Sequence, residues 1–368
     1  MKKIIISGGG TGGHIYPAVS IANALKKAYS AIEILFVGAE GKMEMEKIPT
    51  VGYPIIGLPV AGLQRRFTLK NLAVPFKLMK SLRKASKIIK DFKPDAVVGV
   101  GGYASGPVLK RAAKKGIPTV LQEQNSYAGL TNKLLAKKAR LICVAYDGME
   151  RFFPKEKIML TGNPIRQDLF DLKTIRAEAL EFFQLDLNRK TLLILGGSLG
   201  ARTINESVIA ALELLQSSNI QVILQTGKFY IDQVRQAWDK YKPCHVKVHD
   251  FIYRMDYAYA AADVIISRAG AGTISELCMV GKPCILVPSP NVAEDHQTKN
   301  AMSLVNKQAA LLVTDKDARK QLVEDALKLS ENIELMANLS SNIKKLALPD
   351  AADRIAAEII KLANGQTV

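Results

Sequence analysis

Residues 3–14 read KIIISGGGTGGH, and residues 191–200 read TLLILGGSLG. In both stretches a short apolar run leads directly into a cluster of glycines, and a segment with helical spacing follows. Such a run is typical of a buried parallel strand that turns into its crossover helix. Because the pattern occurs once in each half, we expect two successive α/β units, each with its own parallel sheet.

Short apolar runs continue this alternation between the two glycine clusters and beyond the second. Apolar residues at helical spacing predict helices over residues 17–28 and 203–215, and an amphipathic helix after about residue 350. Gly162-Asn163-Pro164 interrupts helix and strand alike, so we place the joint between the units there. The expected strands cover residues 3–7, 34–37, 96–100, 118–121 and 141–144 in the first half and 191–195, 221–224, 247–249, 264–266 and 284–287 in the second.

Length and composition fit a globular protein of two ordinary domains. The chain has 368 residues, of which 48% are hydrophobic and 23% charged, and these fractions leave room for substantial cores. No apolar run approaches the roughly 20 residues of a membrane-spanning helix. The first residues lack the apolar region of an export signal, and the four cysteines form no CxxC pair. We therefore expect a cytosolic protein with reduced cysteines and no metal or redox site.

The net charge of +17 is concentrated in the first half of the chain. Residues 1–165 contain 27 Lys and Arg against 10 Asp and Glu, whereas the remainder has 24 of each sign. Within this half, residues 64–93 hold ten basic residues and one acid, interleaved with apolar residues. That composition is typical of a segment lying on anionic lipid, although a helix with one core-facing side has the same pattern. Nucleic acid is not an expected partner, because no reader motif accompanies the charge.

Glycine clusters that follow a strand and open a helix occur at residues 8–14, 99–106, 196–200 and 267–273. Glycine lets a backbone approach a phosphate closely, and the helix behind it offers N–H groups and the positive end of a dipole. Each turn is therefore a candidate phosphate site, although the same turn also occurs without a ligand. Together, four such turns favour a phosphate-bearing substrate.

The glycine clusters can be compared with two known nucleotide-binding motifs, GxGxxG and the P-loop GxxxxGK[ST]. Gly8, Gly10 and Gly13 satisfy GxGxxG, and Glu40 stands where a dinucleotide-binding domain has its acidic residue. One dinucleotide, however, leaves the second glycine-rich start at residue 196 unexplained. No GxxxxGK[ST] sequence occurs, which excludes a P-loop NTPase.

Residues 267–276, SRAGAGTISE, carry more chemistry than their glycines. A diphosphate could bind at the helix start while Glu276, one turn further, accepts hydrogen bonds from two ribose hydroxyls. Arg268 adds a second group suited to phosphate. The alternative is a capping box, in which Thr273 caps the helix and Glu276 completes the box.

His14 ends the first glycine cluster, where a neutral imidazole could take a proton from an attacking hydroxyl. Alternatively, it is a helix-start residue that hydrogen-bonds the loop. Asp315-Lys-Asp317 matches the metal-binding DxD of some sugar transferases, but Thr314 with Asp317 also fits a helix cap, which we prefer. No metal site is expected.

Seven blocks, taken together, resemble the MurG glycosyltransferases, and the resemblance covers nearly the whole chain. The family fold is a pair of Rossmann-like domains facing a cleft, the GT-B architecture, with a C-terminal helix that returns to the first domain. The resemblance thus implies an acceptor-binding and membrane-associating domain of residues 1–163 with about 350–368, and a UDP-sugar-binding domain of residues 164–349. The blocks are GGGTGGHIYPA (8–18), GGYASGP (101–107), QEQNSYAGLTNK (122–133), TGNPIR (161–166), GGSLGARTIN (196–205), SRAGAGTISEL (267–277) and EDHQTKNA (294–301).

The resemblance also implies an activity: inverting transfer of N-acetylglucosamine from UDP-N-acetylglucosamine to the 4-hydroxyl of the muramoyl-pentapeptide of lipid I. The product would be lipid II for peptidoglycan synthesis, made without a cofactor by a peripheral protein at the cytoplasmic face of the membrane. His14 would be the base, with Glu123 as second choice, and Gly102, Tyr103 and Ser105 would bind the acceptor. Donor contacts would come from Thr11, Gly12, Gly13, Asn125, Arg166, Ser198, Ile252, Arg268, Ala271, Gly272, Thr273, Ile274, Ser275, Glu276 and Gln297.

Two other interpretations stay open at this point. The first is another enzyme on the same fold, such as a UDP-sugar 2-epimerase or a transferase to a different lipid. The second is a non-enzymatic module that binds acidic lipid or nucleic acid through its basic half.

Overall fold

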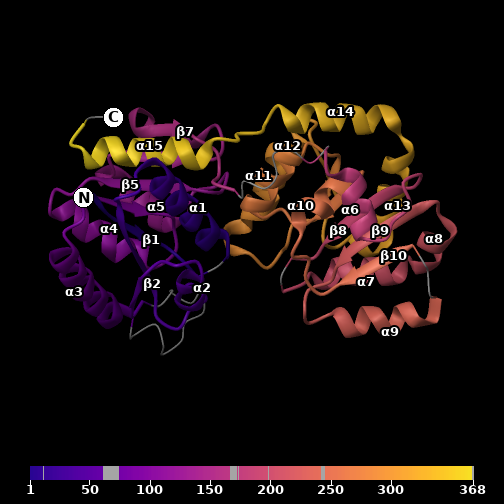
Figure 1. Cartoon of the computed structure of the whole chain (residues 1–368), viewed down its shortest axis with the longest axis horizontal. Helices are drawn as coiled ribbons and strands as arrows, with labels where there is room; N and C mark the ends of the chain where they lie inside the picture. The colour runs from indigo at the N-terminus through magenta and orange to yellow at the C-terminus, as the bar shows by residue number, and fades with distance from the viewer. Residues whose placement is uncertain are drawn as a thin grey trace. The chain divides into compact units, whose positions relative to one another are not determined.

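The computed structural model describes residues 1–10, 12–60, 74–165, 172, 174–197, 199–241 and 245–366. The chain divides into two compact units, Met1–Ile165 with Leu348–Val368, and Arg166–Ala347. The chain therefore passes from one unit to the other twice, and the first unit is built from both ends of the sequence (Figure 1). Within the described residues, no helix combines the length and the apolarity that crossing a membrane requires.

The first unit contains a seven-stranded parallel sheet in the order β3-β2-β1-β4-β5-β6-β7. The chain builds outward from β1 to β3, then crosses to β4 and builds outward to the other edge. The direction of winding thus reverses between β1 and β4, which is the switch point of this sheet. The strands are β1 (Lys3–Ser7), β2 (Glu33–Ala39), β3 (Ile55–Leu58), β4 (Ala96–Gly99), β5 (Thr119–Glu123), β6 (Leu141–Val144) and β7 (Ile158–Leu160).

Helices cover both faces of this sheet. Along β1, Ile4 and Ile6 join one core and Ile5 joins the other, because successive side chains of a strand point to opposite faces. A strand buried on both faces needs apolar residues throughout, which explains the uninterrupted isoleucines. The first core is completed by α1 (Gly12–Ala28), α2 (Glu44–Thr50) and α15 (Ala351–Ala363), and the second by α3 (Val74–Phe92), α4 (Ser105–Lys114) and α5 (Leu130–Leu135).

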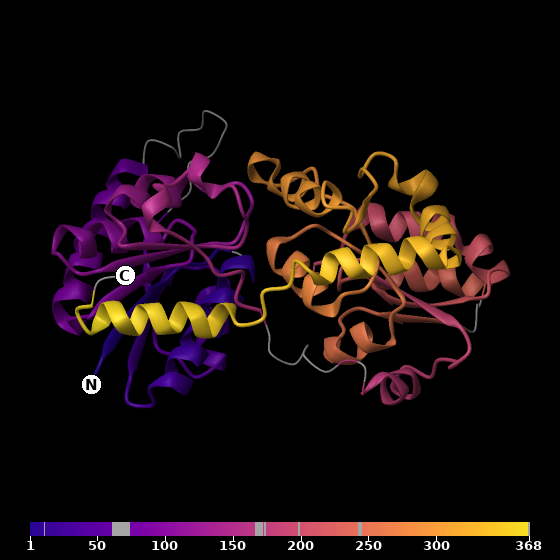
Figure 2. The same cartoon turned by 90° about the horizontal axis from the view of Figure 1, so that it is seen from above.

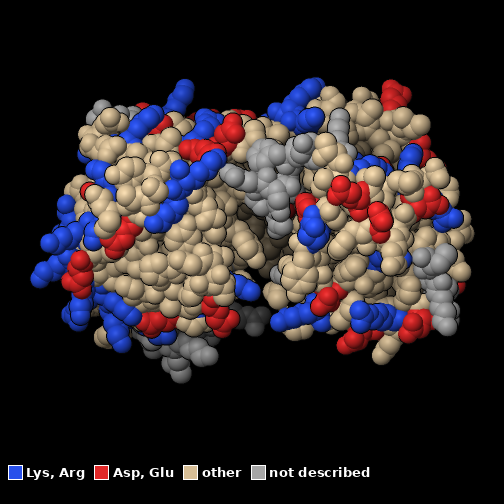
Figure 3. All heavy atoms as spheres, viewed as in Figure 1, with Lys and Arg blue, Asp and Glu red and all other residues tan. Residues whose placement is uncertain are grey.

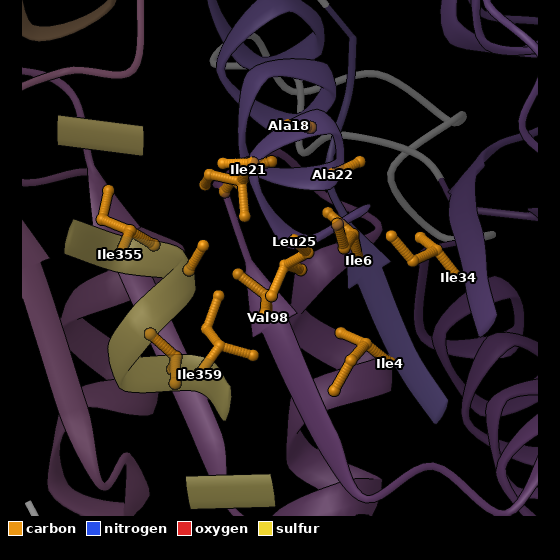
Figure 4. Close-up of a cluster of buried hydrophobic side chains, with 14 of the residues drawn as sticks. Ile4, Ile6, Ala18, Ile21, Ala22, Leu25, Ile34, Val98, Ile355 and Ile359 are labelled. Carbon is orange, nitrogen blue, oxygen red and sulfur yellow. The ribbon is translucent and has the colours of Figure 1, made fainter. Parts of the chain in front are cut away.

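The C-terminal helix α15 is part of the first core. Ile355 and Ile359 of α15 lie beside Ile21 and Leu25 of α1 and beside Val98 of β4 (Figure 4). Two perpendicular views both place α15, in yellow, along the indigo and purple elements of the first unit (Figures 1 and 2). The expectation that the last helix returns to the first domain is confirmed.

The second unit contains a six-stranded parallel sheet in the order β10-β9-β8-β11-β12-β13. Its winding reverses between β8 and β11, as it does between β1 and β4 in the first unit. The strands are β8 (Lys190–Leu195), β9 (Ile220–Gln225), β10 (Val246–His249), β11 (Val264–Ser267), β12 (Cys284–Leu286) and β13 (Leu311–Leu312). The helices are α6 (Arg176–Phe182), α7 (Arg202–Ala210), α8 (Leu212–Ser217), α9 (Ile231–Tyr241), α10 (Met255–Ala261), α11 (Ala271–Val280), α12 (His296–Val305), α13 (Ala318–Glu331) and α14 (Ile333–Lys344).

Some elements differ from those expected. The first helix begins at Gly12 instead of residue 17, with Pro17 inside it. The helix tolerates this proline because the carbonyl that loses its partner belongs to Gly13, which is exposed. The expected helix 203–215 is divided at Ala211 into α7 and α8. The strands that the sequence did not single out, β3, β7 and β13, lie at sheet edges and are too short for a clear periodicity.

Candidate active site

The four glycine clusters follow β1, β4, β8 and β11, the two strands beside the switch point in each sheet. The carboxyl ends of parallel strands meet at one edge, so within each unit two glycine-rich turns lie next to each other. In open parallel sheets, ligands bind at this edge beside the switch point. The topology therefore gives each unit a paired glycine-rich site, which the sequence alone did not pair.

In the first unit the two turns contact each other directly. Gly102 lies against the backbone of Gly9. The Ser105 hydroxyl is wholly buried, and it is directed at two carbonyl oxygens, those of Ser7 at 2.7 Å and Gly101 at 2.8 Å. Ser105 therefore ties the second turn to the end of β1, whereas the Tyr103 side chain is 59% exposed.

His14 lies on the first turn of α1 with its Nδ1 3.1 Å from the carbonyl oxygen of Gly9. A carbonyl oxygen only accepts hydrogen bonds, so Nδ1 carries the proton and Nε2 of the neutral ring has the lone pair. The Nε2 side of the ring lies against Gly101, where an added Cβ would stand 2.8 Å from Nε2. Gly101 thus leaves room for the histidine between the two turns.

Glu123 ends β5 and is 2% exposed. It accepts hydrogen bonds from the backbone N–H of Asn125 (3.1 Å) and Gly129 (3.0 Å), and from the side-chain amides of Asn125 (3.3 Å) and Asn132 (2.8 Å). Burial raises the pKa of Glu123, while these donors act to lower it. The carboxylate therefore holds the loop of residues 123–132 in shape, and the Asn125 side chain is turned toward it.

Residues of the domain joint also support the first site. The Gln124 side-chain amide donates to the carbonyl of Val100 at 2.7 Å, beside the second turn. Asn163 donates to the carbonyl of Gln124 and accepts from the side chain of Gln122, both at 3.0 Å. From the sequence, Asn163 was only part of the Gly-Asn-Pro interruption between the two units. Its buried hydrogen bonds to Gln122 and Gln124 are visible only in the tertiary structure.

In the second unit, α11 begins earlier than a capping box requires. Its N-cap is Gly270, with an extended backbone and no side-chain cap, so Thr273 is the third helical residue. The capping-box interpretation of Thr273 and Glu276 is therefore wrong, because glycine takes the cap position. Glu276 lies one turn further on, where its Oε2 accepts a hydrogen bond of 3.0 Å from the buried Tyr259 hydroxyl.

Arg268 is engaged with the protein itself. Its Nη1 donates to the carbonyls of Val287 (3.1 Å) and Pro288 (3.2 Å) and lies 2.5 Å from Oδ1 of Asp315. Thr203 donates to the other oxygen of Asp315 at 2.9 Å. The two carbonyl bonds join the ends of β11 and β12, and the ion pair joins the end of β11 to the segment after β13.

The Asp-Lys-Asp segment is likewise occupied by protein contacts. Asp315 pairs with Arg268, and the Thr314 hydroxyl donates to Asp317 at 2.6 Å just before α13. The N-cap of α13 is Asp317, without a side-chain cap, so the interpretation of Thr314 as the cap is wrong, although its hydroxyl also accepts the N–H of Asp317 at 3.3 Å. Across the parts of the chain that the structure describes, no three His, Cys, Asp or Glu side chains form a metal-binding group.

The remaining predicted residues lie in several places. Ile252 is buried and donates its N–H at 3.0 Å to the side chain of Gln225, the last residue of β9, and Gln297 accepts the N–H of Ser289 beyond β12 at 2.9 Å. Gly12 and Gly13 begin α1, and Ala271 and Gly272 begin α11. Further along α11, Ile274 is buried, and the Ser275 hydroxyl donates to the carbonyl oxygen of Ala271. The predicted contacts Thr11, Arg166 and Ser198 lie outside the described residues.

Two doubly wound parallel sheets, each with paired glycine-rich turns at its switch point, form the two-domain GT-B architecture, and the family matches that follow make it a glycosyltransferase. Residues 4–144 match the glycosyltransferase family 28 N-terminal domain, and residues 191–355 match the family 28 C-terminal domain.

Relatives narrow this class further. The chain is 59% identical over 98% of both chains to "UDP-N-acetylglucosamine--N-acetylmuramyl-(pentapeptide) pyrophosphoryl-undecaprenol N-acetylglucosamine transferase" of Parabacteroides distasonis. It is 61% identical to the protein of the same name from Phocaeicola vulgatus, over 98% of this chain and 96% of that protein. The crystal structure of Acinetobacter baumannii MurG matches with a TM-score of 0.81 at 29% identity, over 98% of this chain and 100% of that chain. The chain belongs to the MurG family of glycosyltransferases.

Proposed function

We propose that this chain transfers N-acetylglucosamine from UDP-N-acetylglucosamine to the muramoyl 4-hydroxyl of undecaprenyl-diphospho-muramoyl-pentapeptide, with inversion. The product is the lipid II precursor of peptidoglycan. The observation that carries the proposal is near-full-length identity to relatives named for this reaction. The first unit, with residues 348–368, would bind the acceptor, and the second unit would bind the UDP-sugar.

The donor would bind at the paired turns that follow β8 and β11. The first turn of α11 directs N–H groups and a positive dipole end toward the diphosphate. Glu276 would accept hydrogen bonds from the ribose hydroxyls, with Tyr259 holding the carboxylate in place. Ile252, fixed by Gln225, would adjoin the uracil, and Gln297 would bind from the start of α12. Arg268 would act mainly by bracing this edge of the sheet, because Asp315 engages its guanidinium.

The acceptor would bind at the turns that follow β1 and β4. The backbone of Gly102 suits its diphosphate, and the exposed Tyr103 suits a substrate contact; Gly12 and Gly13 stay predicted contacts of the donor. Ser105 would contribute through the backbone, because its hydroxyl is already directed at two carbonyls. Glu123 would shape the neighbouring loop and turn Asn125, and His14 would be the base.

The chemistry then follows from charge and position. The 4-hydroxyl oxygen forms a bond to the anomeric carbon as the bond to the UDP oxygen breaks on the opposite face, and the hydroxyl proton passes to Nε2 of His14. Negative charge grows on the leaving diphosphate, where the α11 dipole stabilises it. Arg166, which follows the domain joint, would add a cation there.

The first half of α3 supplies a surface suited to an anionic membrane. Phe76, Leu78 and Met79 are exposed, and Lys and Arg side chains gather over α3 (Figure 3). Exposed apolar groups can enter the lipid interface while cations contact the headgroups. This surface supports a peripheral association with the membrane that presents the lipid-linked acceptor, and we propose the cytoplasmic face for it.

The deciding experiment measures UDP release from UDP-N-acetylglucosamine with and without lipid I. Release that depends on lipid I and yields a β-linked disaccharide supports the proposal. Conversion of UDP-N-acetylglucosamine in the absence of acceptor would indicate an epimerase instead. His14→Ala is expected to lower kcat by about 10²–10⁴-fold while UDP affinity is retained, since His14 is proposed to act on the acceptor hydroxyl and is not among the predicted donor contacts.

A further inference from the structure

A buried carboxylate without a sequence-predicted role lies behind the first glycine-rich turn. Glu44, the first residue of α2, is 1% exposed. Its Oε2 accepts the N–H of Gly10 at 2.8 Å, and its Oε1 accepts the N–H of Ala39 at 2.9 Å. A charged group at this depth is costly unless it is hydrogen-bonded. These two backbone donors therefore fix the Glu44 carboxylate between the end of β2 and the first turn.

The surrounding backbone leaves a space that this carboxylate fills. A Cβ added to Gly9 would overlap the carboxyl group of Glu44, and a Cβ added to Gly38 would stand 2.6 Å from its Cγ. Gly9 has a φ of +142°, a backbone conformation that residues with side chains rarely adopt. The contact of Glu44 with the turn is thus built into the backbone on both sides.

One peptide group joins Glu44 to His14. The N–H of Gly10 donates to Glu44, and the carbonyl oxygen of Gly9, in the same peptide bond, accepts from Nδ1 of His14 at 3.1 Å. A peptide group is conjugated, so a charged acceptor at its N–H increases the negative charge on its oxygen. That oxygen then accepts a stronger hydrogen bond, as it does in other polarised chains.

We propose that Glu44 is a positioning residue that acts on His14 through the Gly9–Gly10 peptide. It holds the first turn in place and favours the tautomer with the proton on Nδ1, so that Nε2 presents its lone pair. When Nε2 takes the acceptor proton, the polarised carbonyl stabilises the positive ring. The catalytic part of this inference rests on the proposed role of His14, whereas the tautomer does not.

The tautomer can be read without substrate by NMR of the full chain labelled with ¹⁵N-histidine. The chain has four histidines, and a His14→Gln variant identifies the ring concerned. We expect the Nδ1–H pattern in the wild type, and a gain of Nε2–H in Glu44→Gln, whose amide removes the charge and one acceptor. Glu46→Gln, an exposed residue on the same helix, is the matched control and should leave the pattern unchanged.

Kinetics separate positioning from a general loss of structure. Glu44→Gln is expected to lower kcat by at least about tenfold, a part of the usual effect of a base, with the KM for UDP-N-acetylglucosamine within about twofold of wild type. Glu46→Gln should retain wild-type kcat. An Nε2–H tautomer of His14 in the wild type overturns the proposal, whether or not Glu44→Gln folds. The proposal is also overturned if Glu44→Gln folds and His14 keeps the wild-type tautomer. If the tautomer of His14 depends on Glu44 but the wild-type chain has no transferase activity, only the proposed function is refuted.

Discussion

Two carboxylates and one histidine surround the first site, and they differ in how the backbone holds them. Glu123 accepts four hydrogen bonds, two from backbone N–H groups and two from side-chain amides. Glu44 accepts two, both from backbone N–H groups. His14 donates through Nδ1 to one carbonyl, which sets the lone pair on Nε2. The geometry therefore suits His14 to accept a proton and the two carboxylates to fix loops.

The raised pKa of Glu123 leads to a prediction about pH. A raised pKa means that the folded state binds this proton more tightly than the unfolded state, so stability is present at low pH and falls as pH rises from the ordinary value of 4.5 through the raised one. Relative to Glu123→Gln, the wild type should lose local stability over this range. Amide hydrogen exchange of β5 at several pH values, corrected for intrinsic rates, measures the difference. A difference that stays constant with pH would contradict the prediction.

At the donor site, Tyr259 offers a test of the Glu276 assignment. Glu276→Ala should weaken UDP binding by about 1–3 kcal/mol, and Tyr259→Phe by about 0.5–1.5 kcal/mol, because the carboxylate loses a donor that orients it. Titration calorimetry with UDP measures both. Tyr257 lies on the same helix as Tyr259, and its hydroxyl bonds Glu178 of α6, so Tyr257→Phe is the control. Unchanged affinity in Glu276→Ala would remove the ribose assignment.

At the scale of the element, α3 combines two roles along its length. Its second half contributes Ala85, Ile88 and Ile89 to a core, whereas its first half exposes Phe76, Leu78 and Met79. The core-facing interpretation is thus confirmed for the second half of α3, while lying on lipid stays a prediction for the first half; residues 64–73 of the basic segment lie outside the described residues. The core face anchors the helix, and the exposed part supports the proposed membrane contact.

The double variant Phe76→Ser with Met79→Ser should bind anionic vesicles more weakly. Each fully inserted side chain contributes at most about 1.5–3 kcal/mol, so a loss of tenfold or more in partition is expected. Sedimentation with phosphatidylglycerol vesicles measures it, and added salt should weaken wild-type binding through the cations. Ile333→Ser in the second unit is the control, since Ile333 is 74% exposed and Phe76 77%. Equal binding by wild type and double variant would rule this surface out.

At the scale of the molecule, the chain crosses between units twice, and the last crossing returns α15 to the first core. Ile355, Ile359 and Leu362 of α15 are buried there. The first unit therefore depends on a helix that lies more than 180 positions beyond the rest of the unit, while the second unit is continuous in sequence.

A chain ending at Ala347 should accordingly lose protection in the first unit and retain UDP binding in the second. Loss of a single large buried side chain such as Ile359 typically costs about 2–5 kcal/mol, and this truncation removes several. Hydrogen exchange of β1 and β4 compared with β8 and β11, together with UDP calorimetry, measures the two effects. A chain ending at Asn364 keeps α15 and is the control. Full protection of β1 without α15 would show that the first unit does not need the last helix.

The sequence by itself determined the two parallel α/β units, the joint near residue 163 and the four glycine-rich turns. These features depend on local periodicity and on glycine, so neighbouring residues specify them. The family resemblance added the returning helix, which local patterns do not predict. Short edge strands and the true start of α11 at Ala271 were missed, because two to four residues carry no period and a glycine cap has no side-chain signature.

Only the tertiary structure decided which turns pair at each switch point and which residues hold them. Glu44 is 30 residues from His14, Asn163 is 41 from Gln122, and Asp315 is 47 from Arg268. Strand order brings these groups together, and strand order is set by how helices cover both faces of a sheet. Buried polar groups must find partners wherever the fold places them, so their roles follow from packing and not from sequence spacing.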